Sequence, residues 1–248
     1  MSAPERFVEW INGHVGFNPR AQQSSDALAR LVAGDLTLRS PSLAADLASG
    51  RAIMRLNAAV GTRITERDVG LVFLDPGVPG PLNRARLAVE NKSIMTAHGK
   101  ARKNRYGDVI AYANHLHNHS GKGIAAALVV VNVNPGYRNP DPSASAIARR
   151  YPNMGKIVAD TVGLFAGIPL RELPDEPFDQ PEAVAVVVLD YDGIGEASLV
   201  TDPRPRGPGS HPITTPSSSG CPGCTRPGTR PRTLPRSQTA CVSVGGWL

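Results

Sequence analysis

Cysteine is absent from the first 200 residues of this chain, and all three cysteines, Cys221, Cys224 and Cys241, lie in the last 48 residues. A disulfide framework therefore cannot support the main part of the protein, which excludes the small disulfide-stapled folds of secreted proteins. Chains without structural disulfides are typical of reducing compartments, so we predict a cytoplasmic location.

Long apolar segments are missing as well. The apolar run from Ile124 to Val131 is among the longest in the chain, whereas a membrane-spanning helix needs about 20 such residues. The segment from Met1 to Glu9 is charged and contains no apolar stretch of the kind that a secretory signal requires. The sequence therefore predicts a soluble protein.

Acidic side chains are scarce after Val200. Residues 201–248 contain nine Pro, seven Gly and six Arg but a single acid, Asp202. This composition has little to bury, so it predicts a disordered tail at 201–248 and one folded domain at 1–200. The tail carries most of the net charge of +6, which leaves 21 basic against 20 acidic residues in the domain. The high isoelectric point is therefore no evidence that the domain binds nucleic acid.

Helical and strand patterns alternate along the domain. Caps and helical periodicity predict helices at 1–15, 100–118 and 144–167. A further helix is predicted from the Ser24-Ser25-Asp26 cap to Gly34, and another from Ser40-Pro41 through Leu56, with a bend or break at Gly50. Apolar runs bounded by turn residues predict strands at 62–74, 86–92, 124–131 and 183–189. This alternation predicts an α/β domain with a central mixed sheet that is flanked by helices.

A predicted hairpin is the most informative part of the sequence. Its second strand ends in Glu-Asn-Lys, and because successive side chains of a strand alternate between faces, Glu90 and Lys92 point the same way. A turn centred near Pro79 would place Asp68 opposite Glu90, with Asp75 beside the turn. Two carboxylates and one ammonium group on one face are suited to hold a divalent cation and to hydrolyse a phosphodiester.

Here the residues resemble a known family. Asp68 with Glu90-Asn91-Lys92 is similar to the signature of the PD-(D/E)xK nuclease superfamily, which includes restriction endonucleases and related DNA-cleaving enzymes. The core of that family runs helix, three antiparallel strands, helix, strand, and the resemblance covers roughly positions 42–135. The family often has Pro before the first Asp, where this chain has Arg67.

The resemblance implies a Mg²⁺-dependent endonuclease with a restriction endonuclease-like core that hydrolyses double-stranded DNA. The type II restriction class is the first expectation, with a homodimer as one option for its assembly. By the same resemblance, Asp68 and Glu90 ligate the metal together with the backbone carbonyl of Asn91. Lys92 would orient the attacking water and stabilise the charge that grows on the phosphorane.

Two alternative functions stay open. One is a DNA repair or recombination nuclease, although the Gln-x-x-x-Tyr pattern of the recombination branch is missing from the predicted helix at 100–118. The other is a degenerate or truncated relative that binds DNA without cutting it. Ordinary cross-strand pairing of polar residues on an exposed sheet would also explain Glu90, Lys92 and Asp68.

Basic residues gather around the hairpin. Seven of them lie between Arg84 and Tyr106, where Glu90 is the only acid. Such a cluster is typical of a phosphate-binding groove, and a solvated charged face explains it equally well. The residues predicted to contact the DNA backbone are Lys100, Arg102, Lys103 and Arg105, and those predicted to contribute to specificity are Tyr137, Arg138 and Asn139.

Histidines at 115, 117 and 119 end the predicted helix. Residues four apart share a helix face, so His115 and His119 form a candidate metal pair. The simpler interpretation is a polar helix end, where positive charge suits the helix dipole.

Overall fold

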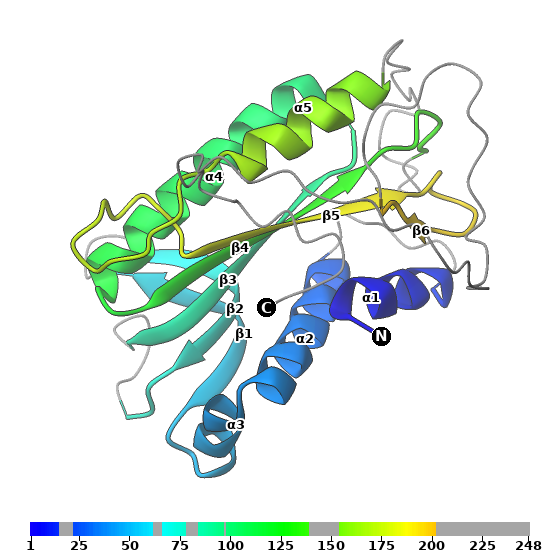
Figure 1. Cartoon of the computed structure of the whole chain (residues 1–248). Coiled ribbons are helices and arrows are strands. Elements are labelled where there is room, and N and C mark those ends of the chain that lie inside the picture. Colours follow the sequence, from blue (N-terminus) through cyan, green and yellow to red (C-terminus); the bar gives the residue numbers. More distant parts are fainter. Residues whose placement is uncertain (15–21, 62–65, 78–83, 97, 139–153, 202–248) are drawn as a thin grey trace, which may run out of the picture. The chain divides into compact units, whose positions relative to one another are not determined.

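The computed structural model describes residues 1–14, 22–61, 66–77, 84–96, 98–138 and 154–201, which form a six-stranded sheet with helices on both faces (Figure 1). The helices are α1 (Ala3–Asn12), α2 (Gln22–Arg39), α3 (Pro41–Ala48), α4 (His98–His119) and α5 (Met154–Ala166). The strands are β1 (Ile53–Gly61), β2 (Glu66–Leu74), β3 (Ala85–Ile94), β4 (Ile124–Asn132), β5 (Ala183–Asp190) and β6 (Ser198–Leu199).

Strand order follows the chain from β1 to β6. The first three strands pair antiparallel, β3, β4 and β5 pair parallel, and β6 closes the sheet antiparallel to β5. The prediction of an α/β domain with a mixed sheet flanked by helices is confirmed. The sheet is mixed because α4 and α5 carry the chain back between parallel strands, whereas short connections join the antiparallel ones.

Each face of the sheet buries a separate apolar layer. On one face, Leu71, Phe73 and Val89 pack beneath α1 and α2. On the other face, Val72 and Ala88 pack beneath α4, and the alternate valines of β4 and β5 pack beneath α4 and α5, namely Val129, Val131, Val186 and Val188. The central strand β4 is buried along almost its whole length, as its run of apolar residues predicts.

The helix that begins at Pro41 has the predicted start but a different end. Ser40 caps it by accepting a hydrogen bond from the Leu43 backbone, as predicted. The prediction that this helix continues through Ile53 to Leu56 is wrong, because the chain turns at Gly50, whose φ is +72°, and enters β1. A whole antiparallel strand therefore lies where helical spacing was expected.

The predicted limits of α2 are also wrong. This helix begins before Ser24, which is buried inside it, and continues beyond Gly34 to Arg39. Its buried residues Leu28 and Val32 pack against the sheet, and this tertiary packing outweighs the local cap and glycine signals.

The remaining predictions on chain organisation have mixed outcomes. The helix at 100–118 and the strands at 124–131 and 183–189 are confirmed within one or two residues at each end. The predicted tail beyond Thr201 and the first part of the predicted helix at 144–167 lie outside the described residues. None of the described helices is both long enough and apolar enough to cross a membrane.

Candidate active site

Glu90 and Lys92 form a buried ion pair on β3. Lys92 Nζ lies 2.5 Å from Glu90 Oε1, and the side chains are 20% and 5% exposed for Lys92 and Glu90, respectively. The contact follows from the strand period, which places residues two apart on one face. Burying a carboxylate is costly unless a cation lies beside it, and Lys92 is such a cation.

A second cation, Arg67 of β2, approaches the same carboxylate. Its Nη2 lies 3.6 Å from Glu90 Oε1. The same nitrogen donates a long hydrogen bond of 3.4 Å to the backbone carbonyl of Asp108 in α4. Both cations approach Oε1 of Glu90. We call Arg67, Glu90 and Lys92 the open-end cluster.

The position of this cluster is set by the end of the β2–β3 pairing. The last paired residues are Leu71 and Val89, after which β3 continues to Ile94 with β4 alone as its partner among the described residues. Glu90 and Lys92 therefore lie where β2 has left the edge of β3. Of the two side chains, Lys92 is the more accessible, at 20% exposed.

Tyr112 of α4 covers the cluster from the helical side. Burial raises the pKa of its hydroxyl well above the ordinary value, and the negative charge of Glu90 raises it further. The tyrosine therefore stays protonated and adds no second negative charge to the site.

The side-chain alternation of β2 is broken at Gly70. Val69 and Val72 belong to the same apolar cluster beneath α4, although residues three apart in a regular strand point to opposite faces. On either side of Gly70, Leu71 and Val69 pair with residues of β1. Gly70 itself lies opposite Asn57, whose φ of +49° is in the left-handed region. The hairpin of β1 and β2 is thus rotated beyond this point.

This rotation turns Asp68 away from Glu90. Its neighbours Arg67 and Val69 both face α4, so Asp68 faces the opposite side of the sheet, where it is exposed. No ion pair joins Asp68 to Lys92 in the described structure, and Asp68 pairs with Ala59 of β1. The predicted register, with Asp68 opposite Glu90, is wrong.

The register differs from the predicted one by two residues, and an irregularity near the turn accounts for one of them. Val72 faces Ala88 and Phe73 faces Leu87, and the pairing shifts by one between Phe73 and Leu74. Glu90 is therefore next to Gly70 in register, one position beyond the last pair. Within the described ranges, no group of three or more His, Cys, Asp or Glu side chains is arranged to hold a metal ion.

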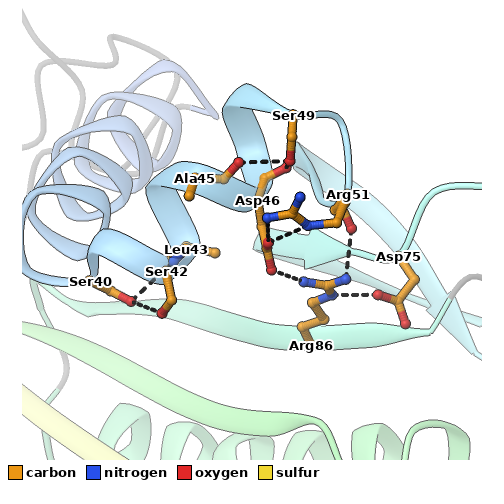
Figure 2. A network of polar contacts seen from close by, with 9 residues as sticks. All are labelled: Ser40, Ser42, Leu43, Ala45, Asp46, Ser49, Arg51, Asp75 and Arg86. Atoms are coloured by element: carbon orange, nitrogen blue, oxygen red, sulfur yellow. Dashed lines mark hydrogen bonds and ion pairs between the residues drawn. The ribbon is translucent and has the colours of Figure 1, made fainter.

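Asp75, the other candidate acid of the hairpin, belongs to a different cluster. Figure 2 shows Arg86 between Asp75 and Asp46, with its Nη1 2.5 Å from the Asp46 carboxylate and its Nη2 donating to the Arg51 carbonyl. Hydrogen bonds from Arg51 and then Arg86 lower the pKa of Asp46. We call Asp46, Arg51, Asp75 and Arg86 the turn-end cluster.

The predicted backbone-contacting residues lie on the first half of α4. Lys100 and Lys103 are exposed, whereas Arg102 lies 3.5 Å from Asp160 and Arg105 lies 2.8 Å from Asp108. Arg105 is 40% exposed, so part of its guanidinium remains available to solvent. The helix that carries them follows directly after the Glu90–Lys92 strand.

The three predicted specificity residues have different positions. Tyr137 is 3% exposed and its ring packs against Tyr191, so it belongs to the core and has no free face for a base. Arg138 is exposed, and its backbone amide is fixed by the Asp192 carbonyl at 2.7 Å. Asn139 lies outside the described residues.

The histidines of α4 serve packing. His115 contacts the Val60 carbonyl at 2.8 Å, and the buried His117 lies between the Phe178 carbonyl and the Glu182 carboxylate. The partners of His115 and His117 lie on separate segments of the chain, and the predicted metal pair of His115 with His119 stays a prediction.

Sequence reasoning missed Arg67 as a partner of Glu90 and Tyr112 as its cover. A signal for Arg67 was present, because this residue stands where the resembled family often has Pro.

Comparisons with known proteins give this site no name. No family model matches the chain, and no curated protein is significantly similar to it.

Proposed function

We propose that this protein is a Mg²⁺-dependent endonuclease that hydrolyses phosphodiester bonds of double-stranded DNA, of the type II restriction class. The observation that carries the proposal is the buried Glu90–Lys92 pair at the point where β2 leaves the edge of β3. A carboxylate and an ammonium group in contact at an accessible strand edge are the groups that metal-assisted phosphodiester hydrolysis requires.

The order of elements supports the same proposal. From α3 to β4 the chain runs helix, three antiparallel strands, helix, strand. This is the order that the resemblance to the PD-(D/E)xK superfamily implies for positions of roughly 42–135.

The donor set at Glu90 suits a hard cation. Mg²⁺ in proteins commonly binds through one or two carboxylates together with substrate phosphates and water. Glu90 would offer its carboxylate, and the adjacent Asn91 would offer its backbone carbonyl. When bound, the ion would polarise the scissile phosphate and lower the pKa of the attacking water.

The residues of the chain perform the remaining tasks. Lys92 holds Glu90 in one position and presents its remaining N–H donors to the scissile phosphate, where they stabilise the growing negative charge. Arg105 and the exposed lysines of α4 neutralise neighbouring phosphates, which positions the duplex without reading its sequence.

A second candidate function, DNA binding without cleavage, is favoured by one observation. Asp68 faces the opposite side of the sheet from Glu90, so the described arrangement brings only one carboxylate to the cluster. In an active nuclease, the β1–β2 hairpin would have to rotate at Asn57 and Gly70 to bring Asp68 to the metal.

Cleavage of long mixed-sequence DNA by the full chain, with Mg²⁺ or with a chelator, tests both functions. We expect cleavage with Mg²⁺ that is lost in the double variant E90Q/K92M, which removes the paired charges together and leaves only the partly exposed Arg67 without its carboxylate partner. The matched control is D75N/R86M, which makes the same change of charge at the turn-end cluster and should retain cleavage.

Asp68 decides between the two functions. If the protein is a nuclease, Asp68→Asn should greatly reduce Mg²⁺-dependent cleavage while Asp75→Asn should not. DNA binding by the wild-type chain without cleavage at any Mg²⁺ concentration would establish the non-catalytic function instead.

A further inference from the structure

A cavity of about 180 Å³ lies beside the open-end cluster, between the sheet and helices α1 and α2. Its floor is apolar and deeply buried, since Phe7, Ile11, Leu28 and Leu189 line it and each is at most 3% exposed. Two cations, Lys92 and Arg105, also belong to the lining and are more accessible, with 20% and 40% of their side chains exposed. The cavity thus combines an apolar floor with two basic residues in its lining.

One wall carries an acceptor that lacks a partner. Asn91 points to this side of β3, opposite to Glu90, and its Nδ2 donates a long hydrogen bond, 3.4 Å, to the Ser25 carbonyl. Its Oδ1 is buried and accepts no hydrogen bond from the described residues. Buried acceptors are normally satisfied, so this oxygen indicates that a ligand with an N–H donor belongs beside it.

Gly70 fixes the orientation of that amide. A Cβ at Gly70 would lie 3.2 Å from Asn91 Nδ2, which is tighter than ordinary contact. Glycine therefore leaves room for the amide beside β2, with its nitrogen toward Ser25, and Asn91 is one of the residues that line the cavity.

Gln22 presents a second acceptor in the lining. Its amide nitrogen donates to Asp26 at 2.8 Å and to Asn57 at 2.7 Å, which uses both of its N–H groups. Only Oε1 remains for a ligand. Two acceptors on the lining of one cavity favour a ligand that carries an amino group.

The size of the cavity limits the ligand to one small ring. An engineered cavity of about 150 Å³ in another protein holds a benzene molecule, whereas pockets for drug-sized ligands begin at about 300 Å³. A pyrimidine fits the first description better than a purine does. Among the pyrimidine bases of DNA, cytosine has the exocyclic amino group that the two acceptors require.

We propose that this cavity receives a single unstacked cytosine base of DNA, while the phosphate attached to that nucleotide lies between Lys92 and Arg105. Enzymes that take a base out of the helix hold it by hydrogen bonds to its pairing edge and by contacts with apolar side chains, and polar and apolar residues for both line this cavity. The choice of DNA as the carrier rests on the proposed function, but nucleotide binding is testable without any cleavage.

Binding of free nucleotides to the full chain is the first test. We expect dCMP to raise the melting temperature more than dTMP, and both to raise it more than dAMP or dGMP, at millimolar concentrations. Deoxyribose 5-phosphate, which has the phosphate and no base, should have little effect. An equal effect of deoxyribose 5-phosphate, or a larger effect of the purine nucleotides, would overturn the proposal.

Matched variants locate the binding. Ser24→Phe places a ring into the cavity from a residue that is 5% exposed, and it should abolish the dCMP effect. Gln23→Phe adds the same ring at the adjacent exposed position of α2, which does not line the cavity, and should leave the dCMP effect unchanged. If Ser24→Phe does not fold, Asn91→Leu removes the acceptor at similar volume. Retained dCMP binding in a folded Asn91→Leu variant would contradict the role given to Oδ1.

DNA containing one unpaired cytosine is the second test. Because extrusion costs least for an unpaired base, a duplex with cytosine opposite an abasic site should bind about tenfold more tightly than the fully paired duplex. The same duplex with unpaired adenine should show no such gain, and equal gains for both would overturn the proposal. Failure of cleavage with these preferences intact would remove the nuclease function and leave the base pocket standing.

Discussion

The β2–β3 hairpin carries a charged cluster at each end, and the two differ in burial and in the balance of their contacts. In the turn-end cluster every member is at least 25% exposed, and Arg86 joins two different carboxylates and a carbonyl. In the open-end cluster Glu90 is 5% exposed, and two cations approach the same oxygen of one carboxylate. The turn-end cluster therefore fastens α3 to the hairpin, whereas the open-end cluster leaves capacity for a further ligand.

The difference matters energetically. Exposed ion pairs contribute at most about 1 kcal/mol each because solvent screens them. Burying Glu90 is costly unless its charge is balanced, and the fold accepts that cost at a strand edge where no other strand pairs in the described structure. Buried ionisable groups beside an accessible edge are more typical of functional sites than of simple fastening.

The largest expected effect comes from Lys92→Ala. Removing a donor aimed at a developing negative charge typically reduces kcat by about 10²- to 10³-fold, and we expect a loss of this size in DNA cleavage with DNA binding nearly unchanged. Cleavage kinetics and equilibrium binding on the same preparation, with a circular dichroism melt, are the measurements. Full activity in the folded variant would make the open-end cluster as structural as the turn-end cluster.

The basic half of α4 should show a smaller effect that is confined to DNA binding. Replacing Arg102, Lys103 and Arg105 together by Ala should weaken binding and reduce the slope of log affinity against log salt by about 0.9 for each lost phosphate contact. Arg102 and Arg105 also pair with Asp160 and Asp108, so a melting curve must accompany the binding data. An unchanged salt slope with an intact fold would place the DNA groove elsewhere.

Arg86→Ala sharpens the comparison from the other end of the hairpin. Because Arg86 is 37% exposed and Asp46 keeps its contact with Arg51, the loss of stability should be only about 1 kcal/mol. Chemical denaturation measures this loss, and cleavage by the folded protein should be retained. A loss of cleavage comparable to that of Lys92→Ala would show that the turn-end cluster acts in the reaction.

The sequence predicted the part of the site that depends on local periodicity. Alternation along β3 placed Glu90 and Lys92 on one face, and the structure brings them into contact. Pairing across the hairpin was not predictable in the same way, because a bulge at Phe73 and Leu74 shifts the register. Asp68 turned away because Asn57 and Gly70 interrupt the strand geometry, and a backbone angle at one residue leaves no pattern in the sequence.

The wider fold shows the same division between local and tertiary effects. The cap at Ser40 and the buried strand at 124–131 were found because neighbouring residues specify them. β1 was missed because Leu47, Ile53 and Met54 fit helical spacing as well as strand spacing. Only the turn at Gly50 separates α3 from β1, and the continuous helical spacing across this turn hid the start of the strand.

The smallest expected effect concerns pH and His98, the first residue of α4. His98 is 1% exposed and contacts the Asn132 carbonyl at 2.6 Å. Burial lowers its pKa, the hydrogen bond opposes this shift, and the charge of Arg102 adds to the lowering. The folded protein therefore keeps His98 neutral at a pH where the unfolded chain already binds a proton, so the free energy of unfolding falls as the pH drops below about 6.5.

This contribution is limited to about 1.4 kcal/mol per pH unit for one proton and ends once the pH reaches the lowered pKa of the folded state. His98→Gln can still donate to the Asn132 carbonyl but cannot titrate, so the loss of stability between pH 7.5 and pH 5.5 should be smaller than in the wild type. Urea denaturation at both pH values measures the difference, with the exposed His14→Gln as the matched control. An identical pH dependence in His98→Gln and the wild type would show that His98 titrates in the folded protein as it does in the unfolded chain, and the open end of the hairpin would then be less sealed from solvent than the burial of His98 indicates.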